Sequence, residues 1–174
     1  MEALTYEDFK ADVLARRRAF HLELRDTYNV ESEDEPFRRW LDGEPDDYAW
    51  HAEWASFVRQ ATATGVHIQR ARLASVPHTD YIRWGLDVSP LNIKAGEDIR
   101  YLPRDLTSDI ELPEEDFWLL DDDVLILSVF SADGRTGSFA RSAGTRRWTS
   151  SPTSCWRCAP RTGRPRWRLS AAAR

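Results

Sequence analysis

The chain has 174 residues, which is enough for one domain of ordinary size. Its net charge of −5 is unevenly spread. Residues 135–174 hold ten Arg and no acidic residue, which leaves 14 basic and all 29 acidic residues, a net charge of −15, to residues 1–134. The sequence therefore predicts an acidic globular domain over 1–134 and an Arg-rich tail over 135–174. A mean hydropathy of −0.59, with no long apolar run, excludes a transmembrane helix.

Two further features bear on location. Glu2, Glu7 and Asp8 stand where a secretory signal has a basic start and an apolar stretch, so export is not expected. Both cysteines, Cys155 and Cys158, lie in the tail, so the acidic domain has no disulfide framework. We therefore expect a cytoplasmic protein.

The first third of the chain predicts helices. Residues 5–28 place apolar side chains at helical spacing behind Thr5, a suitable N-cap with an acidic capping-box partner three residues further on. A short helix is expected to begin at Pro36. Another is expected over residues 51–64, with Gly65 just after its C-cap.

From residue 66 the pattern changes to that of strands. Residues 66–73 alternate, although Arg70 and Arg72 share a face with two apolar side chains. A helix over residues 78–88 is expected to follow. Three more strands are expected at residues 98–102, 116–120 and 124–130.

Two turns organise this second part. The acidic run 121–123 joins the last two strands, and Asp133-Gly134 is typical of a hairpin turn, which predicts a further strand. The predicted order is N-terminal helices followed by a β-α-β-β-β unit in a single domain. We expect an α/β or α+β fold in which helices cover at least one face of a sheet.

The tail does not supply the alternating second arm that this hairpin needs. It lacks apolar periodicity and is rich in Arg, Ser, Ala, Thr and Trp. Such a composition is typical of a G+C-rich gene translated in a shifted frame, or of a disordered segment. Two alternatives remain open: a basic arm for nucleic acid with tryptophans as stacking groups, and a redox or metal pair at Cys155 and Cys158.

Charged side chains are the main candidates for chemistry. Carboxylates at strand ends would hold a divalent ion or form solvated turns, and Asp is a common turn residue, which favours turns. The arginines would form an anion pocket or pair with these carboxylates, and the acidic excess favours pairing. The candidate ligand- or partner-binding residues are Arg70, Arg72, Tyr81, Arg83, Glu97, Asp98, Arg100, Asp116, Trp118, Asp121 and Asp122.

Catalytic motifs are missing from the sequence. It contains no GxGxxG, Walker A, GxSxG or HExxH motif, and no His-x-Lys. We therefore expect no catalytic residue, no resident metal and no cofactor.

Three segments carry a family resemblance: VPHTDY (76–81), AGEDIR (95–100) and DFWLLDD (116–122). Together they resemble an uncharacterised actinobacterial family, a domain of unknown function, over about residues 5–135. Its members are often encoded beside XRE-type helix-turn-helix regulators, in WhiJ- and BldB-like clusters. Members continue after the hairpin into a helix with an acidic end, where this chain has its Arg-rich tail.

The resemblance implies a cytoplasmic accessory or regulatory protein without catalysis. It would act with a helix-turn-helix transcription regulator or a small regulatory protein, by protein-protein interaction or by sensing a small ligand. The element order is also similar to a phospholipase-D-like half domain, whose active members need the His-x-Lys motif. An acidic domain has few groups for phosphate contact, so neither direct nucleic-acid binding by this domain nor membrane binding is expected. The alternative is a metal-dependent hydrolase or nuclease that uses Asp98, Asp116, Asp121 and Asp122.

Overall fold

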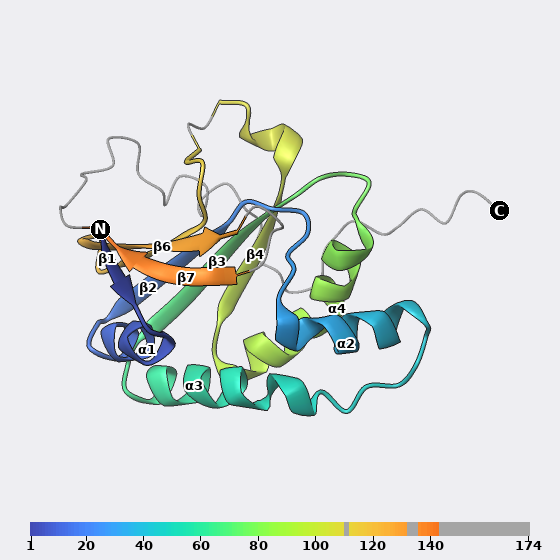
Figure 1. Ribbon diagram of the computed structural model, residues 1–174, viewed down its shortest axis with the longest axis horizontal. Helices are drawn as coiled ribbons and strands as arrows, with labels where there is room; N and C mark the ends of the chain where they lie inside the picture. Colours follow the sequence, from blue (N-terminus) through green and yellow to red (C-terminus); the bar gives the residue numbers. More distant parts are fainter. Residues whose placement is uncertain (110–111, 132–135, 143–174) are drawn as a thin grey trace.

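The computed structural model describes residues 1–109, 112–131 and 136–142, and within them seven strands form one mixed sheet (Figure 1). The strand order across the sheet is β1-β7-β6-β5-β2-β3-β4. The strands are β1 (Glu2–Leu4), β2 (Arg18–Glu23), β3 (His67–Ala74), β4 (Asp98–Pro103), β5 (Phe117–Leu120), β6 (Val124–Phe130) and β7 (Thr136–Arg141). The helices are α1 (Tyr6–Leu14), α2 (Glu31–Leu41), α3 (Ala52–Ala63) and α4 (Asp80–Ala95), with short 3-10 helices η1 (Ala49–His51) and η2 (Arg104–Thr107).

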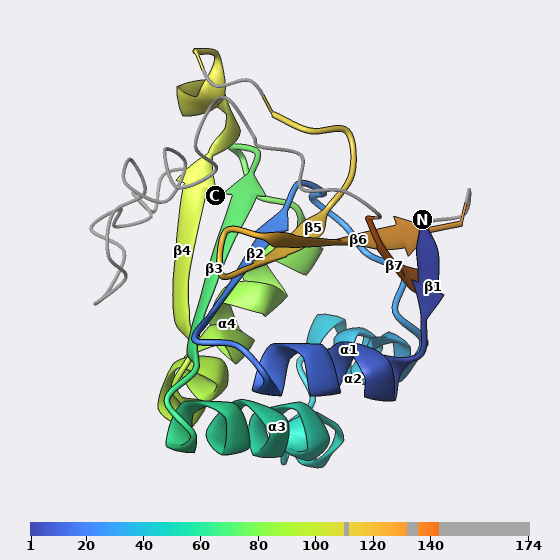
Figure 2. The same ribbon diagram turned by 90° about the vertical axis from the view of Figure 1, so that its left-hand side faces the viewer.

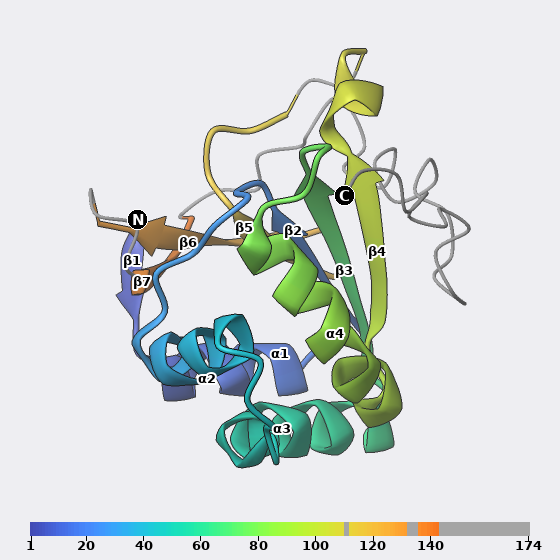
Figure 3. The ribbon, with the colours of Figure 1, turned by 90° about the vertical axis from the view of Figure 1, so that its right-hand side faces the viewer.

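The sheet combines two kinds of pairing. β2, β3 and β4 are parallel neighbours, whereas β5, β6, β7 and β1 continue the sheet from β2 in antiparallel pairs. The sheet is strongly twisted, and α1–α4 gather on one side of it (Figures 2 and 3). The predicted α/β fold in a single domain is confirmed.

The helix predicted over residues 5–28 is wrong after residue 14. Its start is confirmed: the side chain of Thr5 accepts from the backbone N–H of Asp8 at 3.1 Å, and the capping box is complete. The chain then enters β2 in the middle of the sheet, where side chains on both faces are buried. A strand buried on both faces lacks the simple alternation of apolar and polar side chains. Phe20 and Leu24, four residues apart, therefore match the spacing of a helix, and the segment was predicted as one.

The other helices differ from expectation mainly at their ends. α2 begins at Glu31 and includes Pro36 in its interior, since the acidic residues of its first turn favour a helix N-terminus. α3 matches the predicted helix, and Gly65 follows its C-cap with φ +92°. α4 begins as expected and runs to Ala95, where Gly96 (φ +116°) ends it.

The predicted strands at 66–73, 98–102, 116–120 and 124–130 are confirmed as β3 to β6. A strand after the hairpin signal is also present, because β7 pairs with β6 and β1. β7 takes six residues that the sequence pattern assigns to the tail. Two-sided backbone pairing and the ring of Phe139, stacked 4.3 Å from that of Phe9, hold this strand without clear alternation. The hairpin turn at Asp133-Gly134 and the predictions for residues 143–174, including Cys155 and Cys158, lie outside the described residues.

Apolar side chains cover both faces of the sheet. The larger cluster lies between the sheet and the helices α1 and α3, around Phe9, Val13, Val58, Ile68 and Leu120. On the opposite face, Phe20, Leu22, Leu73, Leu102 and Phe117 form a second cluster. The helix-covered face is apolar only at one end of the strands. At the other end its side chains are polar and charged, which makes this end a candidate for function.

Candidate functional site

The helix-covered face of the sheet changes character along its strands. The register of β2 with β3 and β5 aligns three inward-facing rows, because side chains two residues apart share a face. The first row is buried and apolar: Ala19, Ile68 and Leu120. The second row is His21, Arg70 and Trp118. The third is Glu23 and Arg72, with Asp116 just before the start of β5.

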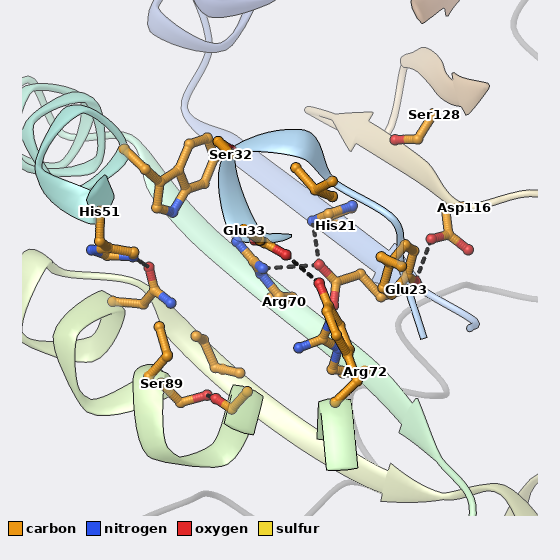
Figure 4. A pocket seen from close by; sticks show the side chains of 18 of the residues that line it. His21, Glu23, Ser32, Glu33, His51, Arg70, Arg72, Ser89, Asp116 and Ser128 are labelled. Atoms are coloured by element: carbon orange, nitrogen blue, oxygen red, sulfur yellow. Dashed lines mark hydrogen bonds and ion pairs between the residues drawn. The ribbon is translucent and has the colours of Figure 1, made fainter. Parts of the chain in front are cut away.

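A cavity of about 430 Å³ lies over the second and third rows (Figure 4). The sheet contributes its polar side chains, and aromatic side chains from η1, α3 and α4 form much of the opposite wall. These are Trp50, Trp54, Tyr81 and Trp84. This volume and this mixture of aromatic walls with a few polar groups are typical of sites for small molecules.

Glu23 joins two arginines at the floor of the cavity. Its carboxylate lies 2.8 Å from Nη1 of Arg70 and 2.6 Å from Nε of Arg72. Nε of Arg70 donates to Oε1 of Glu97 at 2.7 Å. Burial raises the pKa of Glu23, but the guanidinium groups of Arg72 and Arg70 outweigh it and lower the pKa to about 2. Two carboxylates and two guanidinium groups thus balance each other's charge.

Aromatic rings enclose Arg72. Its guanidinium lies 5.4 Å from the ring centroid of Tyr28 and 5.5 Å from that of Tyr81, a cation-π arrangement. Gly85 makes room for it, because a Cβ at this position would lie 2.7 Å from Nη1 of Arg72. Arg72 is therefore a built-in part of the cavity wall.

Two other carboxylates are held by tyrosines. The hydroxyl of Tyr28 donates to Oδ2 of Asp116 at 2.5 Å, and the backbone N–H of Leu24 donates to Oδ1 at 2.9 Å. The hydroxyl of Tyr81 donates to Glu33. Burial raises the pKa of Asp116 to about 6 and also raises that of Glu33. Neither carboxylate forms an ion pair with a Lys or Arg in the described part of the chain.

His21 is an uncharged aromatic element of the floor. Its ring stacks on Trp118 at 4.1 Å, and its Nδ1 lies 3.6 Å from Oε1 of Glu23. Burial lowers the pKa of His21 to about 3, so the imidazole is neutral near pH 7. It offers a flat surface and a hydrogen-bonding nitrogen to whatever fills the cavity.

The cavity collects about half of the residues that the sequence predicts for a site. Arg70, Arg72, Tyr81, Asp116 and Trp118 line it. Glu97 lies behind Arg70, fully buried.

The remaining candidates lie elsewhere. Arg83 is exposed and pairs with Asp80. Asp98 and Arg100 alternate onto the opposite face of the sheet, 3.5 Å apart.

Asp121 and Asp122 belong to the turn between β5 and β6. Oδ1 of Asp121 accepts from the backbone N–H groups of Arg17 and Arg18 at 3.0 and 2.9 Å, and Asp122 pairs with Arg18. Both have positive φ, which Asp tolerates better than most residues. They act here as turn residues.

The carboxylates of the hydrolase hypothesis do not come together. Asp98, Asp116 and Asp121 lie on the opposite face, in the cavity and in the turn, respectively. Across residues 1–109, 112–131 and 136–142, no three His, Cys, Asp or Glu side chains are arranged to hold a metal ion. No helix in this part of the chain combines the length and apolar character needed to cross a membrane.

Sequence reasoning missed several residues of the cavity: Glu23, Tyr28, Glu33, Trp50 and Trp84. Glu23 was not predicted as a site residue, because the apolar side chains around it recur at helical spacing and its segment was predicted to be a helix. A usable signal was present, since His21 and Glu23 interrupt the run Phe20, Leu22, Leu24 with period two, as polar side chains do on one face of a strand.

Fold and site together define a single-domain α/β protein with a partly charged cavity between its sheet and its helices. A family model described as a domain of unknown function, DUF6879, matches residues 8–159, so the chain belongs to this family. The match includes β7 and continues beyond residue 134. No protein with a curated description matches the chain.

Proposed function

We propose that this protein is a non-catalytic sensor module that binds a small organic molecule in the cavity over β2, β3 and β5. The bound state would be passed to a helix-turn-helix transcription regulator or to a small regulatory protein. The observation that carries the proposal is the cavity of about 430 Å³, with aromatic walls and a fixed set of polar groups.

The arrangement of polar groups supports binding rather than catalysis. Glu23, Arg70 and Arg72 are engaged with one another. No hydroxyl or thiol in the described part of the chain hydrogen-bonds the imidazole of His21 or His51, the two histidines of the cavity, so a nucleophile-base pair is not assembled. The lack of a His-x-Lys motif agrees with this, and the phospholipase-D-like relationship stays a prediction.

The charge of the domain supports a basic partner. Residues 1–134 carry a net charge of −15, and DNA-binding regulators present basic surfaces. The family resemblance, through its association with XRE-type regulators, points to the same kind of partner. The charge would favour association with such a protein and disfavour contact with DNA phosphates.

The binding part of the proposal is tested by a small-molecule screen on the full chain with ligand-observed NMR. Ser32 lies at the cavity, on the exposed first turn of α2, so Ser32→Trp should narrow the entrance. Glu31→Trp is the matched control, because Glu31 is exposed on the same turn and does not line the cavity. We expect molecules that bind the wild type and Glu31→Trp but not Ser32→Trp. A library in which no molecule distinguishes the two variants would contradict the proposal.

The partner part is tested by affinity capture of the tagged protein from native lysate, read by mass spectrometry. We expect a helix-turn-helix regulator, in an amount that changes when a molecule from the screen is added. Recovery without any such regulator argues against this partner and leaves the binding result standing.

A further inference from the structure

The charges of the cavity are unequal, and this inequality identifies the kind of molecule that fits. The inference rests on the proposed ligand-binding function. Arg70 and Arg72 are offset by Glu23 and Glu97, at contact distances of 2.6 to 2.8 Å. Among cavity residues, this leaves the carboxylates of Glu33 and Asp116 without an ion-pair partner in the described part of the chain.

Hydrogen bonds hold these two carboxylates in place without neutralising them. Asp116 accepts from Tyr28 and from a backbone N–H, and Glu33 accepts from Tyr81. A tyrosine hydroxyl donates a hydrogen bond but brings no positive charge. Burial of an uncompensated carboxylate is costly, and a cation is the partner that reduces this cost.

The walls next to these carboxylates also suit a cation. Tyr28 and Tyr81 already face the guanidinium of Arg72, and Phe130 faces that of Arg25. The remaining aromatic surface is that of Trp84, whose ring lies 5.4 Å from that of Tyr81. Trp50 stacks on Trp84 at 5.4 Å and extends the aromatic surface. Aromatic faces attract ammonium groups and bury the apolar body of an amine.

An anionic ligand fits the same cavity poorly. Close to Arg70 or Arg72 it would meet the carboxylate of Glu23, which already contacts both guanidinium groups. It would also meet the carboxylates of Glu33 and Asp116. The two arginines, which by sequence alone suggest an anion pocket, already contact carboxylates of the protein itself.

We propose that the cavity binds an organic cation, a small amine or ammonium compound with an apolar body. Its charged nitrogen pairs with the carboxylates of Asp116 and Glu33, and its body lies along the aromatic wall of Trp50 and Trp84. Burial raises the pKa of both carboxyl groups, so a positive partner, which favours their ionised form, should lower it.

Three probes of similar shape and different charge test this inference on the full chain at pH 7.5: 2-phenylethylamine, 2-phenylethanol and phenylacetate. Isothermal titration calorimetry should show the amine binding at least tenfold more tightly than the alcohol, with no measurable binding of phenylacetate. Binding of the alcohol or of phenylacetate that equals that of the amine would overturn the organic-cation inference and leave the sensor proposal intact. Failure of all three to bind would also overturn the inference, while the library screen decides the sensor proposal separately.

Carboxamide variants locate the cation. Glu33→Gln and Asp116→Asn should each weaken binding of 2-phenylethylamine about tenfold and leave 2-phenylethanol unaffected. Glu33→Gln keeps an acceptor for Tyr81, so it remains informative if Asp116→Asn does not fold. The control is Glu35→Gln on the same helix, whose carboxylate is exposed and pairs with Arg38. Unchanged amine affinity in folded Glu33→Gln and Asp116→Asn would place the cation elsewhere and overturn the inference.

Discussion

The two ends of one sheet face differ sharply in chemistry. At one end, Ala19, Ile68 and Leu120 pack under α1 and α3 with Phe9 and Val58, and all are buried. Four residues further along the same strands, charged side chains take the equivalent inward positions. The first end has the composition of an ordinary core, which lowers the free energy of the folded state. The second end buries charged side chains. Buried ion pairs add little net stability to a fold, and charged groups in place of an apolar core are typical of a functional site.

The contrast teaches how a small domain combines the two tasks. β2 and β3 run through both ends, so the apolar end anchors the strands whose other ends carry the cavity. Aromatic contacts mark the boundary, where Phe9 meets Trp118 edge-on at 5.0 Å. Residues of the polar end can then be selected for binding while the apolar end supports the fold.

The largest effect is expected at the polar end, from Glu23→Gln. The change leaves Arg72 without its carboxylate and Arg70 with Glu97 alone. Removing one partner of a buried ion pair costs about 3–5 kcal/mol, because the other charge stays buried. Urea unfolding followed by circular dichroism measures it. Glu35→Gln, in an exposed pair, should cost below about 1 kcal/mol, and equal losses in the two variants would contradict the network.

At the apolar end, Leu120→Ala should cost about 3 kcal/mol, through lost apolar burial and the space left behind. The folded fraction should keep the ligand affinity of the wild type, since Leu120 does not line the cavity. Leu106→Ala is the control, because Leu106 is 64% exposed. Unfolding and binding titrations on the same samples separate the two ends. A loss of affinity in folded Leu120→Ala would show that the ends are coupled.

The pH dependence of unfolding should reveal opposite contributions from two residues at the polar end. His21 has a pKa of about 3 in the folded state, below its ordinary 6.5, so the unfolded chain takes up the proton first as pH falls. Between pH 7 and pH 5 this should remove about 2 kcal/mol of stability. Asp116 has a pKa of about 6, above its ordinary 3.8, so the folded state takes up the proton first and gains about 1 kcal/mol.

Two variants separate these contributions. From pH 7 to pH 5, His21→Gln should become more stable relative to the wild type, and Asp116→Asn less stable. The charged groups that act on His21 are Glu23, Arg70 and Arg72, and those that act on Asp116 include Glu23 and Arg25, with Tyr28 as hydrogen-bond donor. Slopes of equal sign in the two variants would contradict the assignment.

The smallest effect is expected at the acidic turn next to the apolar end. Asp121→Ala removes the acceptor of two backbone N–H groups in an exposed turn and should cost about 1 kcal/mol. Asp121→Asn, which keeps an acceptor and tolerates positive φ, should cost less. Addition of Mg²⁺ should leave the melting temperature of the wild type unchanged. A rise that Asp121→Asn abolishes would instead support the hydrolase hypothesis.

Local patterns in the sequence predict a large part of the fold. Alternation predicts β3 to β6, and spacing with caps predicts the start of α1, the whole of α3 and the first part of α4. The same reasoning fails for β2, which is buried on both faces, and for β1, while β7 is predicted only by the hairpin turn before it and not by alternation of its own. β1 pairs with β7, and these two strands are far apart along the chain.

The candidate site likewise has a part that could be predicted from the sequence and a part that could not. That Arg70 and Arg72 share a face with apolar side chains is visible in the sequence, and the structure shows that this face points inward. Their partner Glu23 lies 47 residues from Arg70 along the chain, and Tyr28 lies 88 residues from Asp116. The sequence by itself determined most of the elements and, within them, which side chains share a face, because these depend on neighbouring residues. Only the tertiary structure decided which charges meet and which stay uncompensated, because the parallel pairing of β2 with β3 brings distant side chains into contact.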